Sequence, residues 1–426
     1  MKTADHLEIR VRGIGAGGVG IGDLPDGKVV FLPRGAPGDL ARVRVIQTKD
    51  RWARGEILEL LEAGPGRRKP PCPRYGECDG CSLQHLEYPD QLEWKGRIVA
   101  DSLGRIGGIP DATPTVVPSP AEFNYRNKAT MTLRRLAGGS LVAGFREVSR
   151  KHRVMDMGTE CLLMVPELSR LWGDLRAAWG PGASLLPRGR ELRLTLRFGE
   201  SEGALLIRGG TGDGEPGRLL GAVPGLGSIW RGDRPDGVRH LAGKAYLGFS
   251  WMEEPLQVPG NAFVQVNQRA GENLHRYVLD TLGPVAGCRV VEGYCGTGAL
   301  GRALARRGGI VVGIEADRQA VAEANREAPR GFQAIDGRVE DRILEHLPAD
   351  LALLNPPRTG LDRKVPEILT EHEVGKIVYV SCDPATLARD LKRLGSTYEL
   401  RDVRSFDLFP QTAHIETVVT LLHRGT

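Results

Sequence analysis

The sequence predicts an α/β protein whose C-terminal half is an open sheet with flanking helices and whose N-terminal half is rich in β-structure. An apolar run from Ile377 to Val380 indicates a buried strand, and a helical pattern from Ala385 to Leu394 follows it after an Asp-Pro break. Another strand, tight turn and helix are indicated from Arg289 to Leu300. By contrast, Leu7 to Glu62 holds short β-rich runs separated by glycine and proline. Ligands of such an α/β sheet are expected at the carboxyl ends of its strands.

Length and composition indicate a globular chain of several domains. With 426 residues the chain exceeds one ordinary core, so two or three domains are expected. It has no apolar run near membrane-spanning length, and Met1 to Arg12 shows no apolar signal region. The net charge of +5 permits nucleic-acid binding without requiring it, and an odd number of cysteines, seven, does not suggest a disulfide framework. We therefore expect a cytoplasmic, monomeric protein without a membrane partner.

The N-terminal segment predicts a small closed β-barrel. The expected strands are Leu7 to Val11, Lys28 to Leu32, Asp39 to Gln47 and Arg54 to Leu60. The glycine-rich stretch from Ile14 to Ile21 is interpreted as a loop or bulge. Together with Val30 to Pro33 and Ala36 to Asp39, this stretch resembles the TRAM domain, which implies RNA contact; a purely architectural barrel is the alternative. Gly64 to Pro71 then indicates a linker.

Three cysteines lie close together in a turn-rich loop after the linker. Cys72, Cys78 and Cys81 have the spacing C-x5-C-x2-C, which is typical of a soft-metal site because a bound cation stabilises adjacent thiolates. Zinc and an iron–sulfur cluster would each need a fourth ligand, and the spacing does not choose between them. Cys161 is the best remaining candidate, since the other three cysteines fall inside patterns of the C-terminal half. A structural or RNA-gripping role is favoured over redox chemistry, because no flavin or nicotinamide motif accompanies the cysteines.

A β-hairpin is expected around the turn at Gly138-Gly139, and it is strongly basic. Between Asn124 and Arg153 the only acidic residue is Glu147, whereas eight residues are basic: Arg126, Lys128, Arg134, Arg135, Arg146, Arg150, Lys151 and Arg153. This excess predicts a phosphate-binding face for RNA, and a solvated charged hairpin is the alternative. The region from Leu162 to Gly260 contains no recognisable motif.

The turn after the strand that begins at Arg289 has the features of a cofactor site. Gly296 and Gly298 would let the backbone approach a ligand closely, and the spacing is not that of a dinucleotide fingerprint. Glu315 ends the next strand, where a carboxylate is suited to ribose hydroxyls. The pair resembles the S-adenosylmethionine site of class I methyltransferases, although nicotinamide enzymes share the layout. A later strand runs into Asn355 and two prolines, which would place a polar side chain beside a transferable methyl group.

Two further residues have positions suited to catalysis. Cys382 is expected at the carboxyl end of a strand, beside a helix N-terminus whose dipole would favour its thiolate as a nucleophile. Glu416 directly precedes the last apolar strand, from Thr417 to Leu422, and could act as a base. A small half-buried cysteine and an ordinary surface carboxylate are the respective alternatives.

In combination the motifs resemble one family, the RNA uracil-5-methyltransferases, over nearly the whole chain. The motifs are SCDPATLARD around Cys382, FPQTAHIE before the last strand, YCGTG after Gly293, and Phe263 to Asn267. The cysteine pattern is similar to the iron–sulfur branch of that family, which 23S ribosomal RNA enzymes typify. Two departures stand out: Asn355 replaces the usual aspartate, and Glu292-Gly293 replaces aspartate and leucine.

The resemblance implies roles for individual residues. A [4Fe–4S] cluster would be held by Cys72, Cys78, Cys81 and Cys161. S-adenosylmethionine, or the pocket around it, would be contacted by Gln265, Tyr294, Glu315 and Asn355, with Gly296 and Gly298 in the adjoining turn. Cys382 would be the nucleophile that adds to uracil C6, and Glu416 the base that removes the C5 proton.

The sequence thus predicts three domains: a TRAM-like β-barrel at 1–63, a central iron–sulfur and RNA-binding domain at 64–260, and a class I, Rossmann-like methyltransferase domain at 261–426. The expected activity is S-adenosylmethionine-dependent methylation of uridine C5 in structured RNA, with 23S rRNA as the expected substrate. Transfer RNA is the nearest alternative substrate. An inactive RNA-binding or assembly factor is the alternative class, against which the intact Cys382, Glu416 and glycine turn argue.

Overall fold

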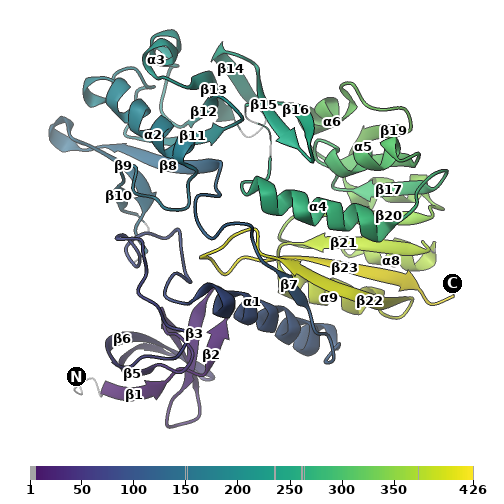
Figure 1. Ribbon diagram of the computed structural model, residues 1–426, viewed down its shortest axis with the longest axis horizontal. Coiled ribbons are helices and arrows are strands. Elements are labelled where there is room, and N and C mark those ends of the chain that lie inside the picture. Colours follow the sequence, from purple (N-terminus) through teal and green to yellow (C-terminus); the bar gives the residue numbers. More distant parts are fainter. Residues whose placement is uncertain are drawn as a thin grey trace. The chain divides into compact units, whose positions relative to one another are not determined.

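The computed structural model describes residues 6–148, 150, 152–234, 237–260, 262, 264–372 and 374–425 (Figure 1). The chain divides into two compact units, each built from separate segments. The first contains Met1–Pro65, Tyr88–Pro120 and Arg269–Thr426, and the second contains Gly66–Glu87 and Ala121–Gln268. Among the described residues, no helix is both long and apolar enough to cross a membrane.

The first unit is organised around an eight-stranded sheet. Its strands, in spatial order, are β19 (Phe332–Asp336), β18 (Ile310–Glu315), β17 (Arg289–Gly293), β20 (Leu351–Leu354), β21 (Lys376–Ser381), β23 (Glu416–His423), β22 (Tyr398–Phe406) and β7 (Thr115–Val117). Strands β17 to β21 are parallel, whereas β23 runs antiparallel to both of its neighbours. The strand order reverses between β17 and β20, and ligands of open α/β sheets bind at such a switch point.

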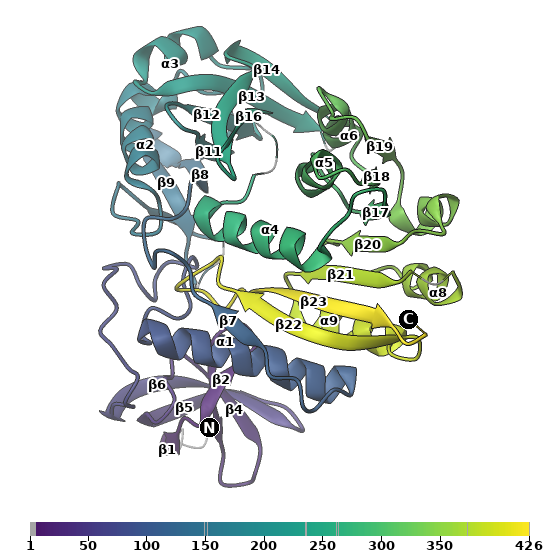
Figure 2. The ribbon, with the colours of Figure 1, turned by 45° about the vertical axis from the view of Figure 1, so that its right-hand side comes forward.

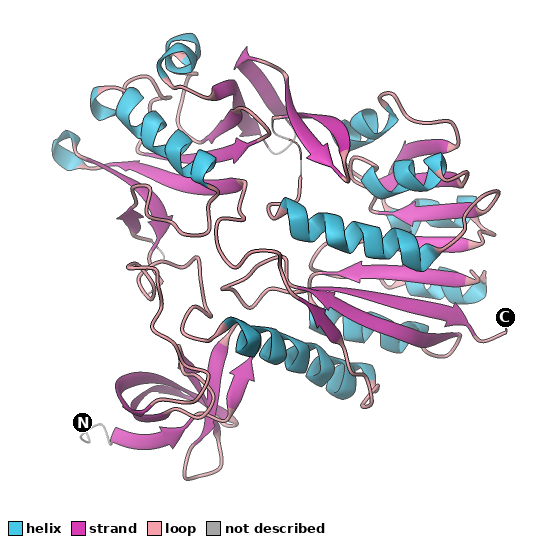
Figure 3. Cartoon of the chain, viewed as in Figure 1, coloured by secondary structure: helices cyan, strands magenta, loops and turns pink. Residues whose placement is uncertain are grey.

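Helices cover both faces of this sheet (Figure 3). They are α4 (Gln268–Leu282), α5 (Ala299–Arg306), α6 (Arg318–Asn325), α7 (Val339–Arg342), α8 (Lys364–Glu371) and α9 (Pro384–Leu394). Every residue of β20 is buried, as expected for a central strand covered on both sides. On one face Leu369 of α8 and Leu387 of α9 pack into the main core, because each helix presents an apolar stripe to the sheet.

The strand β7 is the last strand of this sheet, and the helix α1 (Tyr88–Ser102) before it packs against the same core (Figure 2). Strand β7 pairs in parallel with β22, and Val99 and Leu103 of the α1 segment enter the main core. The domain boundaries expected from the sequence assign this segment to the central domain. The segment lacks a motif, and only its pairing with a strand 289 positions later in the chain, Thr115 with Arg404, shows which sheet it completes.

The N-terminal part of the first unit is a six-stranded sheet. Its strands are β1 (His6–Arg10), β2 (Gly13–Gly15), β3 (Val19–Asp23), β4 (Val29–Pro33), β5 (Leu40–Thr48) and β6 (Trp52–Glu62). They pair in the order β1-β5-β6-β4-β3-β2, with alternating side chains such as Val30, Leu32 and Val43 fully buried between them. The four strands expected from the sequence are confirmed. Closure of the sheet into a barrel stays a prediction, because the pairing order has β1 and β2 as its ends.

The interpretation of Ile14 to Ile21 as a loop or bulge is confirmed only for the turn at residues 16–18 and is wrong for the strands on either side. This stretch forms the hairpin of β2 and β3, which turns at Gly17 and Gly18 with φ of +81° and +79°. Gly20 and Gly22 lie inside β3, where a Cβ atom would come within 2.7 Å of the Gly35 carbonyl oxygen and 2.5 Å of Ile9 Cγ2, respectively. Glycine is thus required by close packing of the sheet, which composition alone does not reveal.

The second unit contains a seven-stranded sheet and a separate two-stranded ribbon. In spatial order the sheet comprises β10 (Val154–Asp156), β9 (Leu141–Arg146), β8 (Lys128–Arg135), β11 (Glu191–Phe198), β12 (Gly203–Arg208), β13 (Leu226–Arg234) and β14 (Gly237–Gly243), and the ribbon pairs β15 (Tyr246–Trp251) with β16 (Glu254–Pro259). The helices α2 (Pro166–Ala178) and α3 (Pro216–Ala222) cover one face, around the fully buried Trp172. The expected basic hairpin is confirmed as β8 and β9, which turn at Ala137–Gly139.

Candidate active site

A cavity of about 760 Å³ opens at the carboxyl ends of β17, β18 and β20, within the first unit. Tyr294, Glu315 and Asn355 line it, each directly after or at the end of one of these strands. The volume is in the range of cofactor pockets. The structure therefore brings together three of the residues that the sequence predicts for S-adenosylmethionine, at the switch point of the sheet.

The turn after β17 shows why two glycines are needed. Gly296 has φ of +55°, and an added Cβ atom would meet nothing within 4 Å, so its backbone faces open space that a ligand can approach. Gly298, at φ +75°, begins α5, and a Cβ atom there would lie 2.7 Å from the Phe332 ring. Tyr294 adopts a positive φ of 63° without being glycine, and its N–H donates to the Ile314 carbonyl at 2.8 Å. The turn is thus fixed against the neighbouring strand.

Glu315 is oriented by backbone donors. One carboxylate oxygen accepts from the Gly296 N–H at 3.0 Å and the other from the Asp317 N–H at 2.8 Å. Asp317 itself caps α6 by accepting from the N–H of Gln319 at 2.8 Å. Each carboxylate oxygen has a second lone pair, so the fixed group is suited to accept hydrogen bonds from ribose hydroxyls.

The opposite wall of the cavity is held by a buried aspartate. Asp390 of α9 is fully buried and accepts from the Leu361 N–H at 2.8 Å and from the Tyr379 hydroxyl at 3.0 Å. The Nε of Arg389 also donates to it at 2.9 Å, while Nη2 of the same side chain donates to the Thr359 carbonyl. This network fixes the loop that follows the exposed Asn355.

Cys382 follows β21 and precedes α9, as the sequence predicts. The residue after it, Asp383, caps α9 by accepting from the N–H groups of Ala385 and Thr386 at 3.0 and 2.9 Å. Burial raises the pKa of the Cys382 thiol, the negative charge of Glu416 raises it further, and Arg358 opposes both effects. The expected contribution of the helix dipole to the thiolate stays a prediction, because the raised pKa of Cys382 reflects burial first and the neighbouring charges second.

Glu416 is the first residue of β23 and lies across from the cysteine. In the antiparallel pairing of β21 and β23, Ser381 is opposite Thr417, so the next positions outward on the two strands are Cys382 and Glu416. Burial raises the pKa of Glu416 to about 8, against the opposing charge of Arg358. The structure thus brings the two predicted catalytic residues together. The positive charge of Arg358, a residue to which the sequence analysis gave no role, lowers the pKa of both.

The nine residues between β22 and Glu416 are clamped by α1. Lys95 and Asp407 form a fully buried ion pair, with Nζ and Oδ1 2.6 Å apart, and the ammonium also donates to the Phe409 carbonyl at 3.1 Å. One helical turn earlier, Gln91 exchanges two hydrogen bonds with Gln411, at 2.9 and 3.0 Å. Gln411 has φ of +69° and is fully buried, so these contacts hold a loop that would not adopt this shape alone.

In the second unit, all four predicted cluster ligands line one cavity of about 360 Å³: Cys72, Cys78, Cys81 and Cys161. Burial raises the pKa of Cys78 to about 11 and that of Cys81 to about 12, and the charge of Cys161 raises both. Four thiols that repel one another as thiolates need a compensating cation. Arg126 lines the same cavity and opposes the rise of the pKa of Cys81 and Cys161.

Within the described chain, no three His, Cys, Asp or Glu side chains are grouped so that they could hold a metal ion. Binding of a metal ion or an iron–sulfur cluster by the four cysteines therefore stays a prediction.

The cysteine loop is attached to the basic hairpin. Cys78 forms a β-bridge with Glu147, and the Cys72 N–H donates to the buried Gln84 side chain at 3.2 Å. Several hairpin cations are already engaged in the fold: Arg134 and Arg146 pair with Glu191, and Arg135 donates to the carbonyls of 182, 183 and 189. Lys151 lies outside the described residues. The predicted phosphate face is thus smaller than the sequence suggests, since three of its arginines have internal partners.

Gln265, the fourth residue predicted to contact S-adenosylmethionine, belongs to the second unit. Its carbonyl accepts from the Asn127 side-chain amide at 3.1 Å. Phe263 of the same motif lies outside the described residues.

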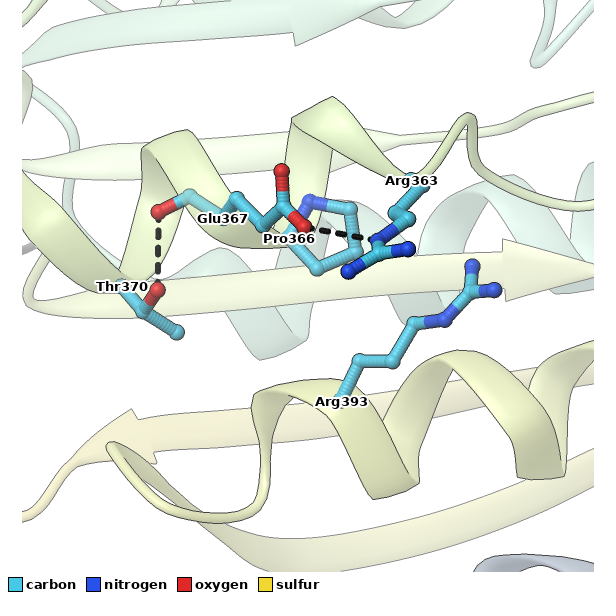
Figure 4. Close-up of a pocket in the computed structure, with 5 residues that line it drawn as sticks. All are labelled: Arg363, Pro366, Glu367, Thr370 and Arg393. Atoms are coloured by element: carbon cyan, nitrogen blue, oxygen red, sulfur yellow. Dashed lines mark hydrogen bonds and ion pairs between the residues drawn. The ribbon is translucent and has the colours of Figure 1, made fainter.

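A second hollow, of about 350 Å³, lies between α8 and α9 (Figure 4). Arg363 and Arg393 line both this hollow and the larger cavity. Arg363 donates a hydrogen bond to Glu367 at 2.9 Å, and Figure 4 draws this bond as a dashed line. Neither Cys382 nor Glu416 lines this hollow or the larger cavity. The carboxylate of Glu367 in the hollow already has Arg363 as its partner.

Sequence comparisons agree with this geometry. The TRAM domain family matches residues 4–58, and the tRNA (Uracil-5-)-methyltransferase family matches residues 329–424. An uncharacterized RNA methyltransferase of Halalkalibacterium halodurans is 31% identical, over 98% of this chain and 97% of its own. One from Gloeobacter violaceus is 35% identical, over 97% and 96%. The crystal structure of the Pyrococcus abyssi tRNA (uracil-54, C5)-methyltransferase in complex with S-adenosyl-L-homocysteine has a TM-score of 0.77 at 27% identity, covering 98% of this chain and 100% of that one.

The sheet order, the cavity at its switch point and these similarities define an S-adenosylmethionine-dependent RNA methyltransferase. Within that class, the chain belongs to the RNA uracil-5-methyltransferase family. The resemblances to this family and to the TRAM domain, drawn from the sequence motifs, are confirmed.

Some residues of the site were not found by sequence reasoning. Arg358 directly follows Asn355 and the two prolines that the sequence analysis used, but its charge acts on Cys382 and Glu416 only after folding. Lys95 and Gln91 are more than 300 positions from the loop that they clamp, and no local pattern signals such a contact.

Proposed function

We propose that the protein methylates C5 of a specific uridine in structured RNA, with 23S ribosomal RNA as its substrate, through covalent addition of Cys382 at C6. The observation that carries the proposal is the register of β21 and β23, in which Cys382 and Glu416 follow directly on an opposed pair. A nucleophile and a base side by side are what C5 methylation requires, because C5 is a poor nucleophile until a group adds at C6.

The residues would act in a fixed order. The Cys382 sulfur adds to C6 of the uracil, and the electron pair of the C5–C6 bond moves to form an enolate. S-adenosylmethionine supplies the methyl group that C5 takes up. Glu416 then removes the proton from C5, and the electron pair of the C5–H bond re-forms the C5=C6 double bond. The C6–S bond breaks at the same time, and its electron pair leaves on the cysteine as a thiolate. Arg358 favours the ionised forms of both side chains.

The target uridine must leave its stack to reach this pair. Unstacking costs a few kcal/mol and less in a loop than in a duplex, so a structured RNA with an exposed uridine is favoured. The TRAM domain supports an RNA substrate.

For the second unit, we propose that four cysteines hold a [4Fe–4S] cluster: Cys72, Cys78, Cys81 and Cys161. The cluster organises the cysteine loop against the β8–β9 hairpin. Iron and sulfide analysis of anaerobically purified protein tests this proposal.

Transfer RNA is the second candidate substrate. It is favoured by the overall similarity to the Pyrococcus abyssi enzyme, which is a tRNA (uracil-54, C5)-methyltransferase. The four-cysteine pattern, which resembles enzymes of 23S rRNA, supports the ribosomal substrate instead.

The test uses radiolabelled S-adenosylmethionine with unmodified transcripts of 23S rRNA and of tRNA, followed by nucleoside analysis. We expect label in 5-methyluridine from 23S rRNA. With Glu416→Gln we expect a trapped protein–RNA adduct, because the cysteine cannot leave while C5 keeps its proton; Cys382→Ala is the matched control, which should form none. Label from tRNA alone would overturn the substrate but not the chemistry. No label from either RNA, in protein that binds S-adenosylmethionine, would overturn both.

A further inference from the structure

The face of the central sheet opposite α2 carries a row of polar side chains. Strands β8 and β11 pair antiparallel, so that Lys128 is opposite Arg197, Thr130 opposite Thr195, and Arg134 opposite Glu191. Side chains on strands alternate, and these six therefore share one face. The Thr130 and Thr195 hydroxyls are 2.9 Å apart, which agrees with this assignment. The other face, with Met131 and Leu194, packs into the core.

The two ends of this row differ in their electrostatics. At one end Arg134 is paired with Glu191, so its charge is compensated. At the other end two cations, Lys128 and Arg197, are directly opposite each other, an arrangement that destabilises a sheet. Arg208 on the adjacent strand β12 is opposite Arg193, four residues before Arg197 on β11, and its positive charge also acts on Lys128.

Arg197 is only 2% exposed, yet much of its guanidinium lacks a partner. Within the described residues, neither Nε nor Nη1 has a hydrogen bond. Burial lowers the pKa of Arg197 to about 10, and burial together with the charges of Arg197 and Arg208 lowers the pKa of Lys128 to about 8. Among the described residues, no carboxylate contributes to either shift.

A folded protein gains nothing by burying a guanidinium without a partner, since an uncompensated buried charge costs several kcal/mol. Such a group persists where a ligand supplies the missing charge. An anion with several oxygens would suit the site, because a guanidinium fork and an ammonium bind phosphate well and the adjacent threonine hydroxyls can donate as well. Lys128 and Thr130 also line the 360 Å³ cavity of the four cysteines, whereas Arg197 and Arg208 do not line it.

We propose that Arg197, Lys128 and Arg208 form a binding site for a backbone phosphate of the RNA substrate. The inference rests on the proposed function, which supplies RNA as the ligand. It also separates the cations of the second unit into two groups: those with internal partners, such as Arg134, and those available to RNA.

The experiment compares Arg197→Met with Arg134→Met, each of which removes one positive charge from the same sheet face. RNA affinity is measured for the full-length protein at a series of salt concentrations, and S-adenosylmethionine binding serves as the check on folding. For Arg197→Met we expect binding weaker by about tenfold or more and a salt dependence flatter by about 0.7 log units for each phosphate that the variant no longer neutralises. For Arg134→Met we expect an unchanged slope, because Glu191 already neutralises that arginine.

Unfolding of the RNA-free protein provides an independent readout. If the charge of Arg197 is compensated only when an anion binds, replacing it by an apolar side chain of similar length should leave the unfolding midpoint unchanged or raise it. A lower midpoint with unchanged RNA affinity and slope would show a structural arginine and overturn the proposal. Equal weakening of RNA binding by Arg134→Met would overturn it too, as a general charge effect.

Two further measurements complete the test: one on a second variant, and one with inorganic phosphate. Arg208→Met replaces an exposed side chain that tolerates change, and it should also flatten the salt slope; an unchanged slope would overturn the site as proposed. Inorganic phosphate at constant ionic strength separates the two sources of phosphate. If it raises the midpoint of the wild type but Arg197→Met binds RNA normally, the site holds free phosphate and the proposal fails. If the wild type methylates RNA and Arg197→Met changes neither RNA affinity nor its salt dependence, the phosphate site alone is refuted. If Arg197→Met flattens the salt dependence but the wild type methylates no RNA, the proposed activity alone is refuted.

Discussion

The two compact units treat buried charge differently. In the first unit, the fully buried Lys95 and Asp407 neutralise each other, and the buried Asp390 is satisfied by two arginines, a tyrosine hydroxyl and a backbone N–H. In the second unit, Arg197 is buried without a carboxylate among the described residues, and four thiols share a cavity with Arg126.

This difference distinguishes buried charges that stabilise the fold from buried charges that can bind a ligand. A compensated buried pair holds its neighbours in place and needs nothing further, whereas an uncompensated one is costly until a ligand arrives. Two carboxylates of the first unit are exceptions. Burial raises the pKa of Glu292, which is 3% exposed, to about 8, and no cation opposes that shift among the described residues. The other exception is Glu416, whose pKa is raised to about 8 with only Arg358 to oppose the shift. It lies where the reaction is proposed to occur, and poised titrating groups are typical of such sites.

Removal of the proposed cluster should have the largest effect. Chelation or oxidation should lower the thermal midpoint of the second unit by about 10 °C or more, because metal binding free energy is folding free energy and each kcal/mol shifts a domain of this size by roughly 2–4 °C. Calorimetry measures the midpoint. The first unit should keep its affinity for S-adenosylmethionine within about twofold.

Cys161→Ser is the matched variant for this prediction, since it removes one ligand and almost no volume. If the variant and the wild type melt alike under anaerobic conditions, the four thiols do not bind a stabilising centre, and the contrast between the units is lost.

Lys95→Met should cost the first unit about 3–5 kcal/mol of unfolding free energy, because it leaves the buried Asp407 without a counterion. Denaturant titration measures the loss. Because Lys95 positions the loop before Glu416, the variant should also accumulate some covalent protein–RNA adduct, which a purely structural loss would not produce.

Lys95→Met combined with Asp407→Asn should regain most of the stability, since neither partner is then charged and the amide can still accept from the Phe409 N–H. A loss below about 1 kcal/mol in the single variant would mean that the pair contributes little, and the comparison between the units would have to be abandoned.

The smallest of the three effects concerns pH. The folded-state pKa of Glu416, about 8, lies above its ordinary value of 4.5, so the folded state keeps the proton longer than the unfolded state. The stability from this group is complete below about pH 4.5 and is lost as the pH rises toward 8. Glu416→Gln should therefore gain stability relative to the wild type over this range, by on the order of a few kcal/mol, reduced because the side chain is only half-buried.

Denaturant titrations of both proteins between about pH 5 and 8 check this prediction. A stability difference that does not change with pH would show that Glu416 titrates normally. The pH dependence of adduct release by the wild type should follow the same ionisation, since only the carboxylate can accept the C5 proton.

Much of the fold and of the proposed catalytic pair follows from local patterns. The strands around Val291, Leu353 and Val378 are continuous apolar runs, which a sheet covered on both faces requires. Cys382 and Glu416 each flank such a strand, so their positions at its end are fixed by the run beside them. By contrast, the β2–β3 hairpin was missed because its glycines serve close packing with Ile9 and Gly35, which no local signal reports.

The sequence by itself determined the family, the strands of the α/β sheet, the proposed nucleophile and base, and the four-cysteine pattern, because each is encoded by short motifs or by single residues beside them. Only the tertiary structure decided that α1 clamps the loop before Glu416, that Arg358 acts on both of the proposed catalytic side chains, and that Arg197 is buried opposite Lys128. These features depend on contacts between distant segments and on the exclusion of water. Burial sets the cost of a charge, and burial exists only after the chain has folded.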